Sequence, residues 1–394
     1  MVSSLNSADA KQFDVKPFKI DLSSKIPHLK GLVSDTRLPA KPLYPEYEYS
    51  GPDRGINLDV LSSLKEEWIT TYDWDAEQAK MNEFEHFTAV IEESMEPDAI
   101  PVILLHGWPG SFHEFMPVIK PLTQAGTNAA GKKVSYDVVV PSLPGFIFSS
   151  LPPANWTTDD VARIFNTLMT DVLGYPKYAV HGTDWGCVVG YSLYSKFAAA
   201  VAAAQFVFIP FIPPSPEQMA AENVTLTAEQ DETVARFNAA GTTGLGFRDM
   251  QTYKPNDVGL ALYDNPVGQL AWMGGNIMRW SDPHAGTPPS RLDSTAILTM
   301  VSLYYLSESF HTSLWIYGAN STAFSPLYTR AATDAPMLYS EYKNNVACWP
   351  REFVAKVGNL VSYIAHDFGG HFPGLDNPPA LIADIREIVS YWNV

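Results

Sequence analysis

The sequence predicts an α/β fold with a doubly wound, mainly parallel sheet, an inserted helical lid and an N-terminal accessory meander. Short apolar stretches have the length of buried strands, and helix-compatible sequence lies between most of them. This alternation is typical of a parallel sheet with helices on both faces. The expected strands are 100–105, 138–141, 178–180, 204–209, 336–339 and 360–364. Between about 211 and 331, helical and aromatic-rich sequence replaces the alternation, as expected of a lid inserted between two strands.

Changes in this pattern divide the 394 residues into three regions. Residues 1–95 would form the accessory region, whose clearest element is an amphipathic helix over 58–70. The sheet and its helices would occupy residues 96–210 and 332–394, and the lid would occupy residues 211–331. A substrate cleft is therefore expected between the lid and the sheet.

The composition excludes several classes of partner. A formal net charge of −17 would repel phosphate backbones and anionic lipid, and no basic stripe offsets it, so no nucleic acid is expected as a partner. Two cysteines are too few for a disulfide framework. The first residues lack the basic and apolar parts of a signal peptide, and no apolar run is long enough to span a bilayer. We therefore expect a cytoplasmic protein without a membrane anchor.

The most informative residue is Asp184, which lies where a short apolar strand runs into a tight turn. The turn has the pattern small-x-nucleophile-x-small, with Gly182 and Gly186 as the small residues, and a helix-compatible stretch follows. A carboxylate that attacks an acyl group gives a labile anhydride, whereas attack on a saturated carbon gives an alkyl ester that activated water can hydrolyse. Aspartate at this position therefore predicts alkylating substrates, epoxides or alkyl halides, rather than esters or peptides.

A second turn supplies partners for this nucleophile. The segment His106–Gly110 directly follows the first predicted strand of the sheet. It can aim the backbone N–H of Trp108 at the carboxyl oxygen that becomes negative during the reaction. The N–H of Trp185, next to the nucleophile, can supply the second donor. Together the two N–H groups would form an oxyanion hole.

His371 is the expected general base. It follows the last predicted strand in the segment Gly369–Pro373. The chain order nucleophile, acid, histidine is the order that an α/β-hydrolase fold uses. Structural explanations serve as well as functional ones for the other histidines considered, which are His181, His106, His86 and His366.

These motifs together resemble the microsomal-type and fungal epoxide hydrolases. The resemblance rests on the elbow Gly182–Gly186, the turn His106–Gly110, the segment Pro141–Phe146, the end Gly369–Phe372 and the N-terminal segments Tyr72–Trp74 and Asn82–Phe87. It covers most of the chain, including the accessory region and the lid, and it implies the α/β-hydrolase fold. We expect no counterpart of the membrane anchor of the animal enzymes in this chain, which makes the soluble fungal branch the closer likeness. A homodimer through the lid would be ordinary for this family.

The resemblance also implies a general acid in the lid. The family opens the epoxide ring with two lid tyrosines that hydrogen-bond to the ring oxygen and protonate it. The second tyrosine matches Tyr317, whereas the first falls on Phe247, which cannot donate. Tyr253, six residues further on, would substitute only in a shifted lid and is more simply explained as a packing aromatic.

The residue that orients His371 departs from the family as well. The family places Asp or Glu after the seventh strand, where this chain has Asn344 and Asn345. An amide can hold a ring nitrogen, but it does not stabilise an imidazolium electrostatically. Glu341 is an alternative partner from the same segment, although a surface glutamate needs no such role. The connection 87–101 is also shorter than in the family, so the adjoining sheet edge is expected to be trimmed.

The leading prediction is an epoxide hydrolase that acts on a small apolar epoxide and water. Asp184 would attack a ring carbon, Tyr317 would protonate the oxygen and His371 would activate water. Neither a metal nor an organic cofactor is implied, because side chains supply all three groups. One alternative is an enzyme of secondary metabolism that cyclises or rearranges an intermediate. Haloalkane dehalogenation, which needs no tyrosine acid, and a non-catalytic ligand-binding role are less favoured.

Overall fold

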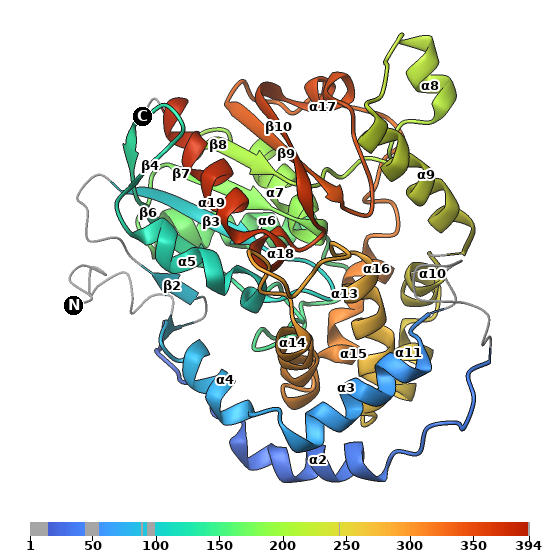
Figure 1. Ribbon diagram of the computed structural model, residues 1–394. Helices are drawn as coiled ribbons and strands as arrows, with labels where there is room; N and C mark the ends of the chain where they lie inside the picture. Colours follow the sequence, from blue (N-terminus) through green and yellow to red (C-terminus); the bar gives the residue numbers. More distant parts are fainter. Residues whose placement is uncertain (1–14, 44–54, 88–89, 93–98, 244, 393–394) are drawn as a thin grey trace.

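The centre of the structure is an eight-stranded sheet with the strand order β1-β2-β6-β3-β7-β8-β9-β10. The computed structural model describes residues 15–43, 55–87, 90–92, 99–243 and 245–392 (Figure 1). Neighbouring strands from β6 to β10 in this order pair in parallel, and β1 and β2 form an antiparallel edge. The strands of the sheet are β1 Glu85–His86, β2 Val90–Glu92, β3 Ile100–Leu105, β6 Tyr136–Val140, β7 Tyr178–Gly182, β8 Val201–Phe206, β9 Pro336–Asn344 and β10 Asn359–Gly370.

Each of the predicted strands is present, and the differences lie at their ends. β3 has the predicted bounds, and β8 lies three residues earlier than predicted. β9 and β10 continue beyond the predicted ends, to Asn344 and Gly370. β8 pairs with β9 up to Tyr339, and the pairing of β9 with β10 runs on past that point. Beyond the pairing with β8, β9 is no longer in the centre of the sheet, so its residues need not form a continuous apolar run. The apolar pattern therefore predicted only the first part of β9 and of β10.

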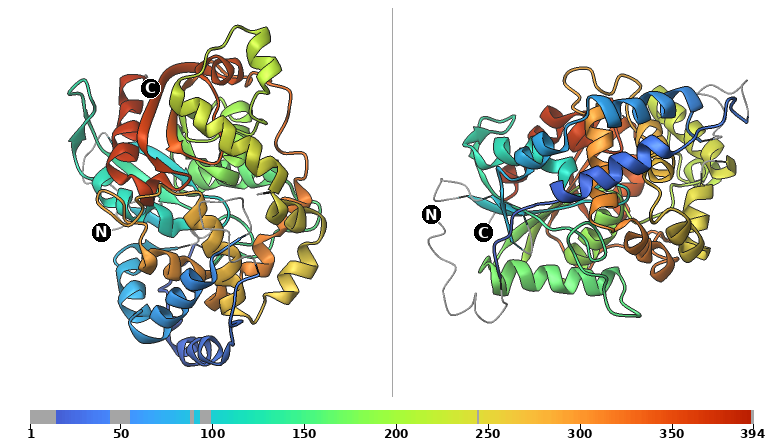
Figure 2. Two further views of the ribbon diagram at one scale, coloured as in Figure 1. Left: turned by 45° about the vertical axis from the view of Figure 1, so that its right-hand side comes forward. Right: turned by 90° about the horizontal axis from the view of Figure 1, so that it is seen from below.

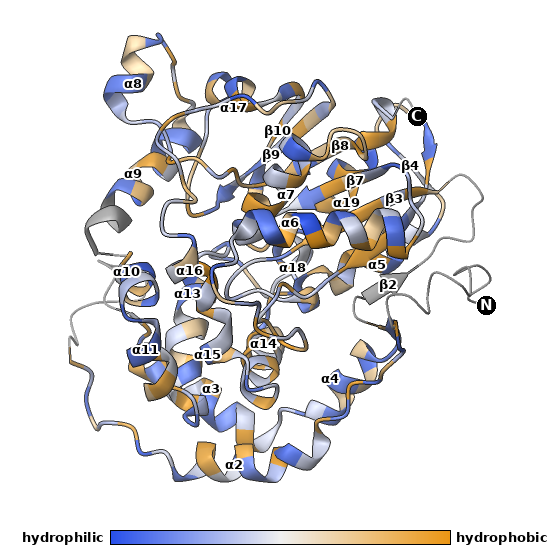
Figure 3. Cartoon of the chain, turned by 180° about the vertical axis from the view of Figure 1, so that it is seen from behind, coloured by the Kyte–Doolittle hydropathy of each residue, from blue (hydrophilic) through white to orange (hydrophobic). Residues whose placement is uncertain are grey.

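Helices cover both faces of the sheet. α6 packs on α7 over one face, and α5 packs with α18 and α19 over the other (Figures 1 and 3). The helices of the core are α5 Met116–Thr123, α6 Thr158–Thr167, α7 Asp184–Lys196, α17 Arg351–Val357, α18 Pro373–Asp376 and α19 Pro378–Arg386. Smaller elements are the hairpin β4 Gly126–Thr127 with β5 Lys133–Val134 and the turns η2 Phe112–Phe115, η3 Leu168–Val172 and η5 Glu387–Ser390.

A helical insertion lies between β8 and β9. Its elements are α8 Pro216–Ala221, α9 Ala228–Thr243, α10 Gly246–Tyr253, α11 Pro255–Ala261, α12 Pro266–Gln269, η4 Leu270–Gly274, α13 Gly275–Arg279, α14 Ser294–Leu306, α15 Phe310–Ser313 and α16 Trp315–Ala319. The elements from α10 to α16 lie together beyond one end of the sheet, whereas α8 lies near α17 and α9 contacts β9 (Figure 1). We call this insertion the lid.

The N-terminal helices brace the lid rather than the sheet. They are η1 Ser23–Lys25, α2 Ile26–Asp35, α3 Leu58–Thr70 and α4 Trp74–Met81, and they lie beside the lid helices at one end of the molecule (Figure 2). The indole N–H of Trp68 on α3 donates to Ser302 Oγ on α14 at 3.0 Å. The helix predicted over 58–70 is α3, with the same bounds.

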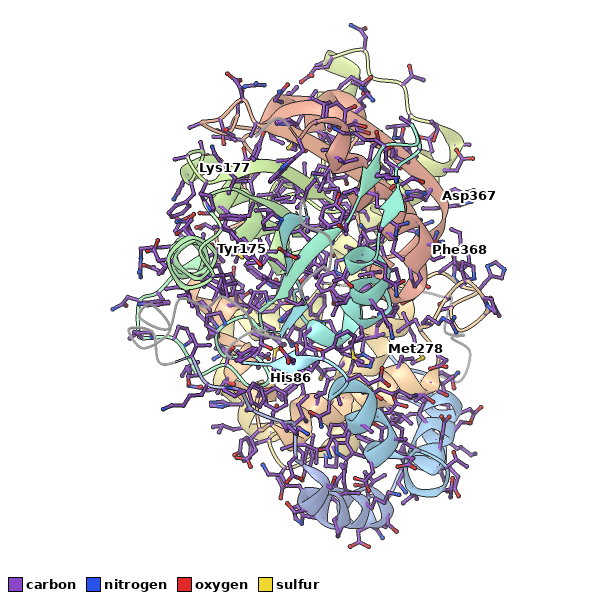
Figure 4. All side chains as sticks on the ribbon, turned by 90° about the vertical axis from the view of Figure 1, so that its left-hand side faces the viewer. His86, Tyr175, Lys177, Met278, Asp367 and Phe368 are labelled. Carbon is purple, nitrogen blue, oxygen red and sulfur yellow. The ribbon has the colours of Figure 1, made fainter. Side chains whose placement is uncertain are left out.

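The sheet edge next to these helices is short. The described parts of its strands are Glu85–His86 of β1 and Val90–Glu92 of β2. Residues 88–89 and 93–98 of the connection lie outside the described residues, so the trimmed edge stays a prediction. His86 marks the junction of this edge with the N-terminal helices (Figure 4). Its Nε2 lies 2.9 Å from the carbonyl oxygen of Met81, so His86 has a structural role.

Candidate active site

Asp184 lies at the elbow between β7 and α7, with a left-handed φ of 46°. Non-glycine residues in this region are strained, and such strain is common at functional sites. Two glycines allow the elbow to form. A Cβ on Gly186 would meet the carbonyl oxygen of Leu105, and a Cβ on Gly182 would lie 2.7 Å from the carbonyl oxygen of Gly186. The elbow therefore needs both glycines of the sequence motif.

The neighbouring turn holds the Asp184 carboxylate. Oδ1 accepts a 2.7 Å hydrogen bond from the backbone N–H of Trp108. Gly107 must lack a side chain, since a Cβ there would collide with the carboxylate. The N–H of Trp185 lies in the first turn of α7, where backbone donors have no intrahelical acceptor. Trp108 N–H thus occupies the position of the first expected oxyanion donor, and Trp185 N–H is available as the second.

His371 lies directly after β10 and faces Asp184. Its Nε2 is 3.2 Å from Oδ2 of Asp184, and its Nδ1 is 2.8 Å from Oδ1 of Asn345. The imidazole is 1% exposed and packs edge-on against Phe208 and Trp280, at ring-centroid distances of 5.6 and 5.3 Å. The burial and the two polar partners define the orientation of the ring.

The hydrogen bonds of Asn345 determine the tautomer of His371. The N–H of Val346 donates to Asn345 Oδ1 at 2.8 Å, and Asn345 Nδ2 donates to the carbonyl oxygen of Val207 at 2.9 Å. A backbone N–H can only donate and a carbonyl can only accept, so the amide cannot be flipped. Oδ1 therefore faces the imidazole, the Nδ1 of His371 carries the hydrogen, and the lone pair of Nε2 points to the side of Asp184.

Two other candidates for orienting His371 lie elsewhere, so the prediction is corrected for both. Asn344 Nδ2 donates to Asp282 Oδ2 at 2.6 Å, because consecutive residues at a strand end point to opposite sides. Glu341 is 6% exposed rather than on the surface, and its carboxylate accepts from Tyr363 and from Gln230. Glu341 lies four residues before Asn345, which along a strand separates the two Cα atoms by about 13 Å. Glu341 therefore does not orient His371.

Tyr317 on α16 lies against the elbow. Its ring is edge-on to Trp185 at 4.9 Å and to Trp108 at 6.0 Å. Burial, followed by the charge of Asp184, raises the pKa of Tyr317 well above its ordinary value of 10, although the nearby side chains of Trp185 and Gln251 oppose this rise. The phenol therefore keeps its proton at neutral pH.

Phe247 and Tyr253 lie on the same lid helix, α10, but in different environments. The ring of Phe247 stacks on Trp108 at 5.7 Å with an interplanar angle of 10° and lies 6.4 Å from the ring of Tyr317. Tyr253 is 74% exposed, because six residues rotate a side chain by about 240° around a helix. The assignment of Tyr253 to the substrate pocket is therefore wrong, whereas Phe247 lines the site without a donor.

Asp282 is a residue near the site that the sequence analysis missed. It is 3% exposed, and its Oδ2 accepts from Asn344 Nδ2 at 2.6 Å and from the Gly369 N–H at 3.0 Å. Burial alone would raise the pKa of Asp282, but hydrogen bonds from the backbone N–H groups of His284 and Gly369 and from the His284 ring outweigh it and lower the pKa. Asp282 thereby ties together the ends of β9 and β10. No sequence signal marks it, since these partners are 62 and 87 residues away.

Other histidines of the core have structural partners. His106 accepts the N–H of Leu143 through Nε2 at 3.1 Å, and burial lowers its pKa to about 4. His181 Nδ1 lies 2.5 Å from Gln205 Oε1, and His366 Nε2 lies 2.8 Å from a carboxylate oxygen of Asp384. None of these contacts reaches the elbow.

Among the described residues, no group of three or more His, Cys, Asp or Glu side chains is arranged to hold a metal ion. In that same part of the chain no helix combines the length and apolar character needed to cross a membrane.

Comparisons with known proteins cover nearly the whole chain. The family described as "Epoxide hydrolase N terminus" matches residues 15–115, and that described as "alpha/beta hydrolase fold" matches residues 100–251. The structure of Aspergillus niger epoxide hydrolase is 31% identical with a TM-score of 0.80, and the match covers 96% of this chain and 97% of that chain. Juvenile hormone epoxide hydrolase from Bombyx mori shares the fold, with 23% identity and a TM-score of 0.82 over 98% of this chain and 97% of that chain. Epoxide hydrolase 1 of Sus scrofa is 26% identical, over 97% of this chain and 90% of its own length.

Proposed function

The chain belongs to the epoxide hydrolase family of α/β-hydrolase enzymes, and we propose that it hydrolyses a small apolar epoxide through an alkyl ester of Asp184. Water activated by His371 then cleaves this ester. One arrangement carries the proposal. The same carboxylate accepts the Trp108 N–H through Oδ1 at 2.7 Å and lies 3.2 Å from the imidazole Nε2 through Oδ2.

In the first step, Oδ2 of Asp184 bonds to a ring carbon while the ring carbon–oxygen bond breaks. Oδ1 stays at the oxyanion hole and becomes the carbonyl oxygen of the ester. The ring oxygen takes its proton from Tyr317, because an alkoxide leaves poorly without an acid. The raised pKa of Tyr317 keeps the phenol protonated until charge develops on that oxygen.

In the second step, His371 takes a proton from water, and the hydroxide adds to the ester carbonyl. Asn345 holds the hydrogen of the imidazole on Nδ1, so Nε2 is the base and points to the side where the ester forms. The negative oxygen of the tetrahedral intermediate is Oδ1, which faces the N–H of Trp108. As the intermediate collapses, the imidazolium of His371 gives its proton to the leaving alkoxide, which releases the diol and leaves a carboxyl group at Asp184. This carboxyl group then loses its proton.

Aromatic side chains around the carboxylate support an apolar substrate. Phe247 lies between Trp108 and Trp280, at ring-centroid distances of 5.7 and 5.0 Å. Tyr317 closes the same group from α16, edge-on to Trp108. Walls of this kind favour apolar substrates, and the few polar groups among them set the substrate's orientation.

One observation favours a second candidate, an enzyme that cyclises or rearranges an epoxide intermediate. The partner of His371 is the neutral amide of Asn345, which does not stabilise an imidazolium. Activation of water is therefore weakened, whereas ring opening by a nucleophile within the substrate uses no water. The two candidates differ in whether oxygen from water is incorporated.

Single-turnover incubation with an aryl or terpenoid epoxide in ¹⁸O-water tests the proposal. Hydrolysis puts the label into the carboxylate of Asp184, because hydroxide adds to the acyl carbon and the diol takes its new oxygen from the protein. His371→Gln should accumulate the ester, since alkylation needs no general base, and Asp184→Ala should fold but not turn over. An unlabelled Asp184 peptide after turnover, or rapid multiple turnover by His371→Gln, would contradict the mechanism.

We further propose that the accessory region, the core and the lid are the units of the protein. The lid helices lie between β8 and β9, and the accessory helices bond to the lid. A homodimer through the lid and a cytoplasmic location stay predictions. Light scattering after size-exclusion chromatography tests the first, and cell fractionation tests the second.

A further inference from the structure

Gln251 is a buried amide of the lid with an unused donor. It lies on α10 and is 0% exposed. Its Oε1 accepts a 2.9 Å hydrogen bond from the indole N–H of Trp272. An indole N–H can only donate, so the amide orientation is settled and Nε2 points away from Trp272. Nε2 has no hydrogen-bond partner within the described part of the chain, which is unfavourable for a buried donor.

The unused donor lies on the helix face that borders the proposed site. Gln251 follows Phe247 by four residues, so the two side chains project from the same face of α10. Phe247 on that face contacts the rings of Trp108 and Tyr317. α10 packs directly on α16, which carries Tyr317. The amide therefore lies one helical turn from the position at which a donor is missing.

The Gln251 side chain lies near the Tyr317 hydroxyl. The pKa of Tyr317 is raised first by burial and then by the charge of Asp184, whereas the side chains of Trp185 and Gln251 lower it. The amide and the hydroxyl are nevertheless not hydrogen-bonded in the resting protein, because Nε2 has no hydrogen-bond partner among the described residues. A contact that is loose at rest can tighten when the phenol oxygen becomes negative.

We propose that Gln251 is the positioning residue of Tyr317, and that its Nε2–H stabilises the phenolate formed when Tyr317 protonates the opening ring. Gln251 would thereby replace, from one turn further along α10, the donor that Phe247 lacks. The inference rests on the proposed acid role of Tyr317. It also explains why a donor is buried without a partner in the resting protein.

Protons and bonds balance in this step. Asp184 Oδ2 bonds to carbon, the ring carbon–oxygen bond breaks, and the ring oxygen takes the proton of Tyr317. The phenolate that remains accepts hydrogen bonds from Gln251 Nε2 and from the side chain of Trp185. The proton that the carboxyl group loses after ester hydrolysis returns to the phenolate, so one water is consumed in each cycle.

The test separates ring opening from ester hydrolysis in single-turnover kinetics with an aryl epoxide. Gln251→Met keeps the volume and removes the donor. It should slow ester formation by roughly tenfold to a hundredfold, the effect of losing a donor to a developing oxyanion, and leave ester hydrolysis unchanged. The matched control is Gln269→Met, which alters another buried lid glutamine whose Nε2 donates to Leu262 O at 2.8 Å. This control should leave both steps unchanged.

Gln251→Glu adds a signature in the pH profile. When protonated, the new carboxyl can still donate to Tyr317, but when ionised it only accepts and repels the phenolate. The rate of ester formation by this variant should therefore fall as the pH rises through the pKa of the introduced carboxyl group. The pH profile of the parent enzyme should lack this decline. Trp272→Phe, which frees the amide to rotate, should give an intermediate rate of ester formation.

The outcomes are distinguishable. Ester formation at the parent rate in folded Gln251→Met, or a parental pH profile in Gln251→Glu, overturns the role of Gln251. If Gln251→Met fails to fold, the pH profile of Gln251→Glu decides. If neither the parent nor any variant ever labels Asp184 in ¹⁸O-water, the proposed function fails, whatever the result for Gln251.

Discussion

At the scale of single residues, Asn345 orients the imidazole of His371 but does not stabilise its positive charge, whereas a carboxylate would do both. Its Oδ1 orients the imidazole of His371, and its Nδ2 donates to the carbonyl oxygen of Val207. The amide thus sets the tautomer but leaves the imidazolium without a negative partner. A carboxylate could not donate to the carbonyl oxygen of Val207, so the surroundings of this side chain favour an amide.

Asn345→Asp should speed hydrolysis of the ester and weaken the fold. The carboxylate stabilises the imidazolium, so we expect the ester to decay roughly tenfold faster in single turnover. The carbonyl of Val207 then loses its donor, which should lower the free energy of unfolding by about 1–3 kcal/mol. Asn344→Asp is the matched control, because that side chain faces Asp282. Acceleration by Asn344→Asp alone would mean that the wrong asparagine has been assigned to His371.

Phe247→Tyr should raise the rate of ring opening for simple epoxides. Phe247 is stacked on Trp108, and a hydroxyl at this position would give the ring oxygen a second donor. Losing such a donor typically slows reactions by two to three orders of magnitude, and Gln251 already offsets part of that loss, so we expect a gain of about tenfold. Allylic epoxides, which open more easily, should gain less. Equal rates for the two enzymes on a styrene-type epoxide would contradict the alignment of this lid position.

The residues that local sequence could predict are those whose chemistry depends on backbone geometry. Asp184 and Trp108 lie at turns whose glycines are visible in the sequence, since a Cβ at Gly107 or Gly186 would collide with neighbouring atoms. The choice between Asn344 and Asn345 could not be made in this way, because it depends on the residue at which β9 ends. Gln251 could not be found either, because its role depends on how α10 lies against α16.

At the scale of elements, apolar runs in the sequence predicted the central strands. The C-terminal parts of β9 and β10, which we call their tails, were not predicted, because they form only through pairing between the two strands. These tails carry Asn344 and the start of the loop to His371. Asp282 joins them from the lid through hydrogen bonds to Asn344 and to the Gly369 N–H. The position of the proposed base is therefore set by contacts between elements that are distant in sequence.

Asp282→Asn should loosen the ends of both β9 and β10. An amide at this position turns one acceptor into a donor that faces other donors, and breaking a buried charged partner lowers the free energy of unfolding by about 3 kcal/mol. The pKa of Asp282 is lowered in the folded protein. The stability it provides is therefore present above the unfolded-state pKa of about 3.9 and is lost as the pH falls through the folded value. Denaturant titrations should show a deficit at pH 7 that narrows in acid.

Asp249→Asn is the control for this prediction, because Asp249 pairs with Arg248 on the exposed side of α10. It should change neither the free energy of unfolding nor the rate of ester hydrolysis. If Asp282→Asn is as stable as the parent at pH 7, the Asp282 carboxylate does not hold the ends of β9 and β10 together.

At the scale of the whole molecule, the accessory helices reach the elbow through the lid. Trp68 on α3 donates to Ser302 on α14 at 3.0 Å, and Tyr72 donates to Thr299 on the same helix at 3.1 Å. Further along α14, the hydroxyl of Tyr304 donates to the carbonyl oxygen of Gly110 at 2.6 Å. Gly110 belongs to the turn that presents the N–H of Trp108. Accessory region, lid and core are thus linked in one continuous set of contacts.

Trp68→Phe should therefore disturb the lid as well as the accessory region. The change removes the donor to Ser302 and leaves space at a side chain that is 1% exposed, which should lower the free energy of unfolding by about 1–3 kcal/mol. We expect one cooperative unfolding transition at a lower temperature and faster hydrogen exchange in α14.

Trp74→Phe is the matched control, since the indole of Trp74 donates to Gln78 within α4. It should lower stability while α14 exchanges as in the parent, because the hydrogen bond that is lost lies within α4. Separate transitions for the two regions, or identical exchange of α14 in both variants, would mean that the accessory helices cover the lid without supporting it.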